Sequence, residues 1–184
     1  MILPIVAFGS KILRKKSIEV SKDEYNLSEL IKNMWETMYE AGGVGLAAPQ
    51  VNKSYRLFII DTTPFLEDKS LNMENAAKKV FINPKIINEN GEKWIFNEGC
   101  LSIPEIREDI LRKPEIKIEY FDENFNKHTE IFTGINARVI QHEYDHLNGV
   151  LFIDKVSTLR KRMIKGKLVD ISKGKITAQY KMRY

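Results

Sequence analysis

Hydrophobic and polar positions alternate with a helical spacing in two long stretches of the chain. In residues 25–41 the apolar residues recur every three or four positions, which predicts a helix that ends at Gly42 and Gly43. Residues 135–147 show the same spacing and stop at Asn148 and Gly149. Residues 157–167 are predicted to form a third helix, which is strongly basic.

Runs rich in β-branched and aromatic residues predict strands between these helices. They are residues 55–60, 80–87, 93–96, 115–121 and 128–132, with a polar loop expected over residues 62–79. The clearest alternation is Ile116, Ile118 and Tyr120, which are interleaved with charged residues as in a half-buried strand. Helices and mostly antiparallel strands are mixed without a βαβ rhythm, so we predict an α+β fold. No linker divides residues 1–184, which we expect to form a single domain.

The composition is that of a soluble globular protein, with 43% apolar and 29% charged residues. The formal charge of +4 is unevenly spread, because Ser157 to Tyr184 holds nine Lys and Arg against the single acidic Asp170. A basic C-terminal tail, about residues 168–184, favours an anionic partner, and we consider the RNA of the ribosome. The alternative, a solvated tail that keeps the protein soluble, stays open.

The chain has a single cysteine, Cys100, so it cannot form an intramolecular disulfide, and this fits a reducing compartment. The N-terminal apolar run is ended by Gly9 and Lys11 and lacks the charged start and cleavage site of a signal peptide. There is no run of 18 apolar residues, so no transmembrane helix is expected. We predict a cytoplasmic protein that binds neither a membrane nor DNA.

The most specific local pattern is His142-Glu143-Tyr144-Asp145-His146. On a helix, His142 and His146 project from one face and can hold one metal ion, while Glu143 beside them can take a proton from metal-bound water. The alternative is a chance pair of histidines on a polar helix.

A catalytic metal site needs three protein ligands and one open position. Downstream of His146 there is no histidine and no glutamate, which disfavours the common zinc proteases. Upstream, Cys100 follows Gly99 shortly after the predicted strand 93–96. A lone cysteine is more often a small buried hydrophobic residue, but a thiolate here could complete a Cys-His-His site.

Three separate segments resemble peptide deformylase: G-V-G-L-A-A-P-Q at residues 43–50, E-G-C-L-S-I-P at residues 98–104, and Q-H-E-Y-D-H-L-N-G at residues 141–149. Their order and spacing also fit that family. The resemblance implies that the strands pack around a central metal-binding helix, residues 135–147. One departure is Asn52, which stands where the family often has glycine, although asparagine tolerates a positive φ.

The resemblance also implies a metal and a reaction. One divalent ion per chain, ferrous in the cell and replaceable by zinc, nickel or cobalt, is expected on Cys100, His142 and His146. The metal lowers the pKa of its bound water, and the resulting hydroxide attacks the formyl carbon of a formyl-Met nascent peptide. Glu143 passes the proton to the leaving amine. The Gln50 side chain and the Leu101 backbone N–H are expected to hold the developing oxyanion.

Residues that bind the substrate are predicted by the same resemblance, and they are Val44, Gly45, Leu46, Gly99, Arg107 and Val139. The glycines let an extended peptide pair with exposed backbone, and the larger side chains form an apolar pocket for methionine. For Arg107 the alternative is a surface salt bridge with Glu105 or Glu108. Glu98 is expected to pair with Arg112, and Asp145 to support the site without catalysing the reaction.

Two other classes of function compete with this interpretation. A metallopeptidase that cleaves internal peptide bonds is disfavoured by the missing downstream ligand. A binding module with a structural metal is disfavoured by Glu143 and Gln50, because a purely structural site needs neither.

Overall fold

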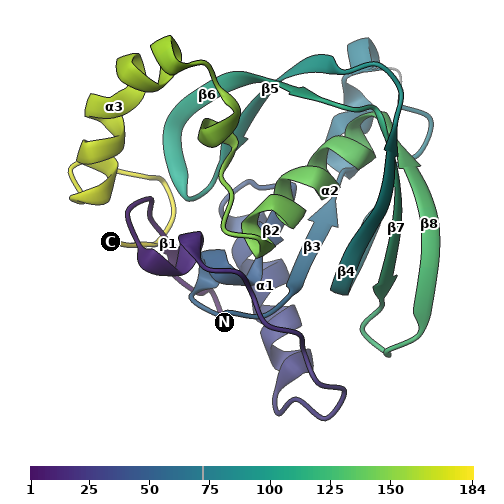
Figure 1. The fold of residues 1–184 in the computed structure, drawn as a ribbon. Helices are drawn as coiled ribbons and strands as arrows, with labels where there is room; N and C mark the ends of the chain where they lie inside the picture. The colour runs from purple at the N-terminus through teal and green to yellow at the C-terminus, as the bar shows by residue number, and fades with distance from the viewer. Residues whose placement is uncertain (72) are drawn as a thin grey trace.

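The main sheet has five strands, each antiparallel to its neighbours (Figure 1). The computed structural model describes residues 1–71 and 73–184. In the spatial order of the sheet, the strands are β2 (Gly45–Ala47), β3 (Leu57–Asp61), β4 (Lys78–Asn90), β7 (Glu115–Phe121) and β8 (Lys127–Thr133). The order leaves one side of β2 unpaired among the described strands, so β2 is an edge strand.

Two helices pack on opposite faces of this sheet, α1 (Leu27–Glu40) on one and α2 (Gly134–Leu147) on the other. Strand β3 shows the reason most clearly, because all five of its residues are buried. Phe58 and Ile60 lie in the core beneath α2, while Leu57 and Ile59 lie in the core beneath α1. A run that is apolar at every position is what a strand covered on both faces requires.

A two-stranded hairpin, β5 (Trp94–Cys100) and β6 (Ile103–Arg112), lies beside α2, and α3 (Thr158–Ser172) packs against β6 (Figure 1). Helix α2 is therefore held between the main sheet and the hairpin. Strand β6 alternates buried and exposed residues, but its buried positions include the charged Glu108 and Arg112 as well as Ile106 and Ile110.

The two ends of the chain lie side by side, because β1 (Ile5–Val6) pairs in parallel with β9 (Met182–Arg183) (Figure 1). The tail that precedes β9 is packed as well, since Tyr180 and Met182 lie against core clusters. Short 3₁₀ helices complete the fold: η1 (Lys11–Arg14), η2 (Ala48–Val51), η3 (Thr63–Glu67), η4 (Lys69–Leu71) and η5 (Phe152–Lys155). No helix in the described part of the chain is long and apolar enough to cross a bilayer.

The predicted α+β fold is confirmed, with mostly antiparallel strands and the helix of residues 134–147 at its centre. The third helix is longer than predicted and ends at Ser172. Strands β1, β2, β6 and β9 were not predicted. The expected loop 62–79 contains η3, η4 and the start of β4, and its position 72 lies outside the described residues. Asn52 has a φ of 61°, the left-handed conformation that its place in the motif predicted it would tolerate.

Candidate metal centre

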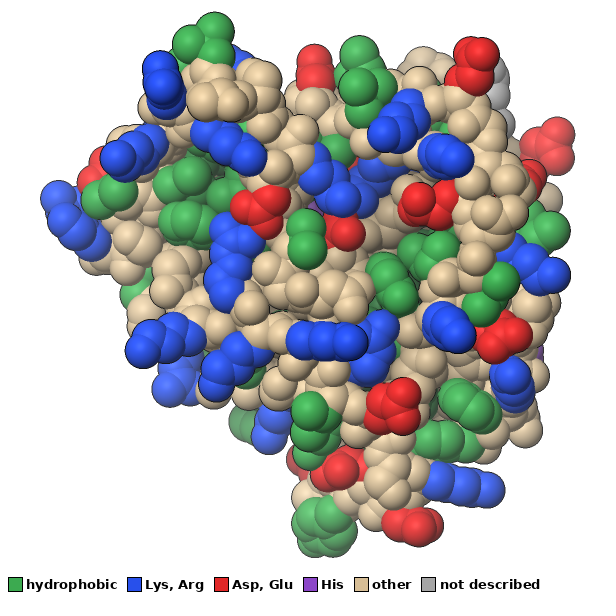
Figure 2. Space-filling view, viewed as in Figure 1, with side chains coloured by type: hydrophobic (Ala, Val, Ile, Leu, Met, Phe, Trp, Pro, Cys, Tyr) green, Lys and Arg blue, Asp and Glu red, His purple; other side chains and the backbone are tan. Residues whose placement is uncertain are grey.

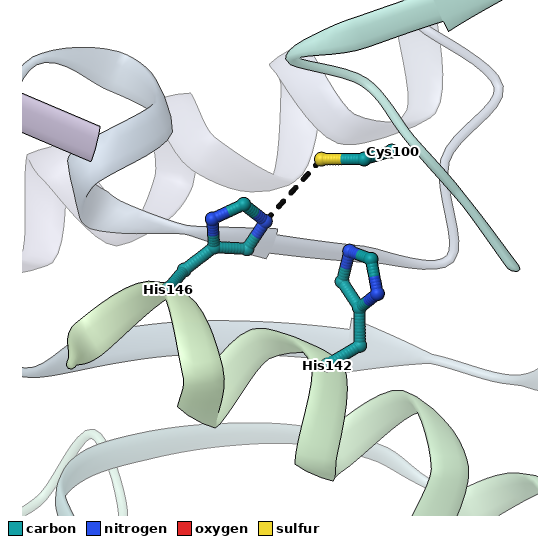
Figure 3. A group of neighbouring side chains, drawn as sticks. All are labelled: Cys100, His142 and His146. Atoms are coloured by element: carbon teal, nitrogen blue, oxygen red, sulfur yellow. Dashed lines mark hydrogen bonds between the residues drawn. The ribbon is translucent and has the colours of Figure 1, made fainter. Parts of the chain in front are cut away.

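Three side chains from two elements converge on one point beside α2 (Figure 3). His142 and His146 lie one turn apart on α2, and Cys100 stands at the end of β5. One ligand atom from each residue lies within 4.8 Å of the other two, and the Cys100 Sγ is 3.3 Å from the His146 Nε2. The structure therefore brings together the three residues that the sequence singled out as metal ligands.

The geometry of these three side chains fits a divalent metal of intermediate softness. Sulfur and imidazole nitrogen bonds of about 2.3 and 2.0 Å in a tetrahedron place the two donor atoms about 3.5 Å apart. The Cys100–His146 separation agrees with this value. Burial holds the pKa of His146 well below its ordinary value, so this ring is neutral, as a metal ligand must be. Burial acts to lower the pKa of His142 as well, but its contacts with Cys100 and Glu98 outweigh burial and raise that pKa, so His142 must release a proton when it binds a metal.

The carboxylate of Glu98 orients His142 from behind. Its Oε2 lies 3.0 Å from the His142 Nδ1, so the Nε2 of that ring is left to face the other ligands. Glu98 also accepts hydrogen bonds from Arg112, at 2.7 and 3.0 Å, and from Arg138, at 2.9 Å. Burial acts to raise the pKa of Glu98, but the hydrogen bonds from His142 and Arg112 outweigh it and lower that pKa. Glu98 is therefore an ionised, buried carboxylate that holds His142 in its orientation.

The predicted pairing of Glu98 with Arg112 is confirmed, and Asp145 completes it by accepting a 2.6 Å hydrogen bond from the Arg112 Nη1. Arg138 is a further member that the sequence did not reveal. It is only 2% exposed, and its guanidinium lies 4.6 Å from the centre of the Trp94 ring. Its position one helical turn before His142 is the signal that would have found it.

Glu143 lies next to His142 but is not held by a neighbour. It is 4% exposed, and its Oε2 has no hydrogen-bond partner among the residues that the structure describes. Burial raises the pKa of Glu143 to about 7. Gly45 makes room for this side chain, because a Cβ at Gly45 would lie 2.8 Å from the Glu143 Cδ.

Gln50 reaches the site from the opposite side. Its Oε1 accepts a 2.8 Å hydrogen bond from the Ala47 N–H, which fixes the amide so that Nε2 faces the hairpin. That Nε2 lies 3.5 Å from the Cys100 Sγ and 3.3 Å from the Ser102 Oγ. Leu101 follows Cys100 directly in the turn between β5 and β6, so its backbone N–H also belongs to this place.

The predicted substrate residues divide between side chains and backbone. Val139 is buried in the core beneath α2, and Val44 is partly buried against that core. Phe96, which the sequence interpretation omitted, is also partly buried against it. The Leu46 side chain is fully buried in the other core, beneath α1, so the predicted pocket cannot use it. Strand alternation would have revealed Phe96, because every second residue of β5 from Trp94 to Cys100 shares one face.

Arg107 lies across Gly99 and forms neither predicted salt bridge. Its Nε and Nη2 donate to the Asn97 side chain and backbone at 2.9 and 2.6 Å. A Cβ at Gly99 would lie 2.7 Å from the Arg107 Nη1, so the glycine permits this contact. Of the two alternative partners, Glu108 pairs instead with Arg160 of α3, at 2.7 Å.

A metal ligand set of one thiolate and two imidazoles, with a free buried carboxylate beside it, defines a metal-dependent hydrolase. The family model for polypeptide deformylase matches residues 2–162. The chain belongs to the polypeptide deformylase family.

Relatives match over the whole chain. A peptide deformylase of Christiangramia forsetii is 59% identical over 189 residues, which cover 100% of this chain and 96% of that protein. One of Flavobacterium psychrophilum is 56% identical over 188 residues, with 100% and 97% covered. Among solved structures, the peptide deformylase of Ehrlichia chaffeensis superposes with a TM-score of 0.85 at 32% identity, covering 96% of this chain and 100% of that one.

Proposed function

We propose that this chain removes the formyl group from the N-terminal formyl-methionine of nascent polypeptides. The observation that carries the proposal is the convergence of Cys100, His142 and His146 beside the free carboxylate of Glu143, in a chain of the deformylase family. The metal would be held by those three ligands, and we propose ferrous iron, with zinc, nickel or cobalt able to replace it. When bound, such an ion acts as a Lewis acid and lowers the pKa of the water that attacks the substrate.

Glu143 is the proposed proton shuttle. Its Oε2 has no hydrogen-bond partner among the described residues, so it is free to accept the proton of the attacking water. The same oxygen then delivers that proton to the leaving amine. Burial keeps bulk water from competing for it, since the residue is 4% exposed.

Gln50 and Leu101 are the proposed donors to the developing oxyanion. The Ala47 N–H holds the Gln50 amide in the orientation that aims its Nε2 towards Cys100. The second donor is the backbone N–H of Leu101, the residue that directly follows Cys100 in the chain. Donors that are fixed before the reaction stabilise the transition state without reorganising, and the loss of one typically costs about 100- to 1000-fold in rate.

The substrate backbone is proposed to pair with the open edge of β2 at Gly45 and with the hairpin at Gly99. Addition of a strand uses main-chain hydrogen bonds and therefore accepts many sequences, as an enzyme for many nascent chains must. Val44, Phe96 and Val139 supply apolar surface for the methionine side chain. Arg107, held over Gly99 by Asn97, closes the outer side of the bound peptide.

The test is release of formate from a formyl-Met peptide by protein loaded anaerobically with Fe²⁺. Glu143→Gln should lower kcat by about 100- to 10,000-fold, with one metal still bound per chain, because Glu143 is not a ligand. The matched control is Glu19→Gln, which should retain the parent rate, because Glu19 is an exposed carboxylate distant from Glu143 in the sequence. Absence of turnover in the parent despite one bound metal would refute the proposed reaction.

A contact with ribosomal RNA is proposed from charge alone. Lys and Arg side chains gather on the side of the molecule where α3 and the C-terminal end lie (Figure 2). Reversing two exposed charges of the C-terminal tail, Lys173→Glu with Lys181→Glu, should weaken co-sedimentation with ribosomes and flatten its salt dependence. Unchanged sedimentation would remove this proposal and leave the deformylase proposal intact.

The single domain over residues 1–184 and the cytoplasmic location stay predictions.

A further inference from the structure

The carbonyl of Leu101 accepts a 2.7 Å hydrogen bond from the hydroxyl of Tyr180, a residue 79 positions later in the C-terminal tail. Leu101 is the residue that follows the metal ligand Cys100 and whose N–H is the proposed oxyanion donor. Tyr180 and Leu101 also pack against the same core cluster, beneath α1. The tail therefore reaches the active site directly.

Two further contacts hold Leu101 and the residue after it. A Cβ at Gly43 would lie 2.7 Å from the Leu101 Cδ1, so the side chain rests against the backbone of the first motif. The next carbonyl, that of Ser102, accepts a 2.8 Å hydrogen bond from the Phe8 N–H. The Leu101 carbonyl and N–H belong to two successive peptide planes that meet at the Leu101 Cα, and only φ and ψ of this residue turn one plane against the other. Fixing the carbonyl and the side chain restricts these two rotations and therefore the direction of the N–H.

The position of Tyr180 is itself set by the pairing of the chain ends. The Ile5 N–H donates to the carbonyl of Lys181 and the Ala7 N–H to that of Arg183, both at 2.8 Å. A second tail hydroxyl, that of Tyr184, donates to the Ile176 carbonyl at 2.8 Å and takes no part in this pairing. Burial raises the pKa of Tyr180, so its hydroxyl remains a protonated donor at neutral pH.

We propose that Tyr180 is a positioning residue for the deformylation reaction: its hydroxyl holds the Leu101 carbonyl and thereby restrains the rotations about the Leu101 Cα that aim the Leu101 N–H at the oxyanion. The inference rests on the proposed function, since it assigns Leu101 that role. It gives the C-terminal tail a role in positioning Leu101, which neither a solvated tail nor an RNA-binding tail would have.

Tyr180→Phe removes the hydroxyl and keeps the ring, so the packing against the core survives. The matched control is Tyr184→Phe, which removes the other tail hydroxyl that donates to a backbone carbonyl, at a place away from Leu101. For each zinc-loaded protein, kcat and KM are measured with a formyl-Met peptide. Hydrogen exchange at the Leu101 amide is followed by NMR, and metal content and thermal midpoint are recorded.

Tyr180→Phe should lower kcat by about 3- to 10-fold, the range that the loss of one hydrogen bond gives. KM should stay within about twofold, Leu101 amide exchange should accelerate by a similar factor to the kcat loss, and one zinc should remain bound. Tyr184→Phe should change neither kcat nor that exchange rate. A lower thermal midpoint with unchanged kcat and unchanged Leu101 exchange would overturn the proposal. If the parent itself shows no turnover, the proposed function fails. Hydrogen exchange at the Leu101 amide still decides whether Tyr180 restrains the backbone at Leu101.

Discussion

The backbone of Gly45 lies directly against the side chain of Glu143, so that a Cβ at position 45 would come within 2.9 Å of the Glu143 Cγ. Real Cβ atoms are almost never this close to another carbon, so one of the two groups would have to move. Gly45 is on the edge strand β2, and Glu143 is on α2. The glycine of the first motif is thus a requirement of the carboxylate in the third.

Gly45→Ala should displace Glu143 and lower kcat by at least about 100-fold, the contribution of a positioned proton shuttle. Metal content should not change, because the three atoms nearest to such a Cβ all belong to Glu143, which is not a ligand. Steady-state kinetics and metal analysis check both statements. Gly166→Ala is the control, since a Cβ there meets nothing within 4 Å, and in the middle of α3 it should stabilise the protein by about 0.5–1 kcal/mol. A Gly45→Ala protein with the parent kcat would contradict this account.

Glu98→Gln should weaken both the fold and the metal site. The neutral side chain leaves the buried Arg138 without a carboxylate and Arg112 with that of Asp145 alone, and removing one partner of a buried ion pair costs about 3–5 kcal/mol. The same change loosens His142, and loss of such a supporting carboxylate typically lowers metal affinity about 10- to 100-fold. Chemical denaturation and metal competition titrations measure the two effects. Asp170→Asn, at an exposed 3.8 Å pair with Lys175, should change neither quantity.

Asp154 should make stability depend on pH in the acid range. Burial acts to raise the pKa of Asp154, but hydrogen bonds from Arg14 and from the Leu151 N–H outweigh it, so the pKa is lowered. A carboxyl with a lower pKa in the folded state contributes stability above its unfolded pKa, about 3.9, and loses it as pH falls through the folded value. The free energy of unfolding should therefore differ between the parent and Asp154→Asn by a constant amount from about pH 5 to 7.

That difference should shrink as the pH falls below about 4. Because the side chains of Arg14 and Asp154 are 43% and 37% exposed, we expect the difference in unfolding free energy to be only about 1 kcal/mol at neutral pH. Urea unfolding of both proteins across the pH range measures it. A difference that grows towards low pH would have the wrong sign and would rule out the ion pair with Arg14 as its source.

The sequence predicted those elements in which the pattern of apolar and polar residues agrees with the burial of each position. Strand β7 was predicted with its observed bounds, because its buried isoleucines alternate with polar residues. Strand β6 was missed although its burial alternates just as regularly, because Glu108 and Arg112 occupy inward positions. Those charges are tolerated only because Arg160 and Glu98 meet them from distant parts of the chain. Such pairing is a property of the folded state and leaves no local pattern.

The same distinction holds within the site. Motif spacing predicted the ligands, since two of them are one turn apart on a helix and the third ends a strand. The contact between Tyr180 and Leu101 could not be predicted, because a tyrosine in an irregular tail has no periodicity that says where its hydroxyl points. The role of the Leu46 side chain was misassigned, since a three-residue strand is too short for alternation to show which core each residue enters.

Removal of the metal should expose the Cys100 thiol to chemical modification. Cys100 is the only cysteine of the chain, so a thiol reagent reports on it alone. A metal-bound thiolate is withheld from the reagent, whereas the half-buried thiol of the metal-free protein, beside His146, is free to react. Chelation should therefore raise the rate of modification by at least about tenfold, and adding back one equivalent of Zn²⁺ should restore protection together with activity. Gln50→Ala separates contact from ligation, because Gln50 touches Cys100 without being a ligand. That variant should keep the zinc-dependent protection while losing activity, and a modification rate that ignores the metal in the parent would show that Cys100 does not bind it.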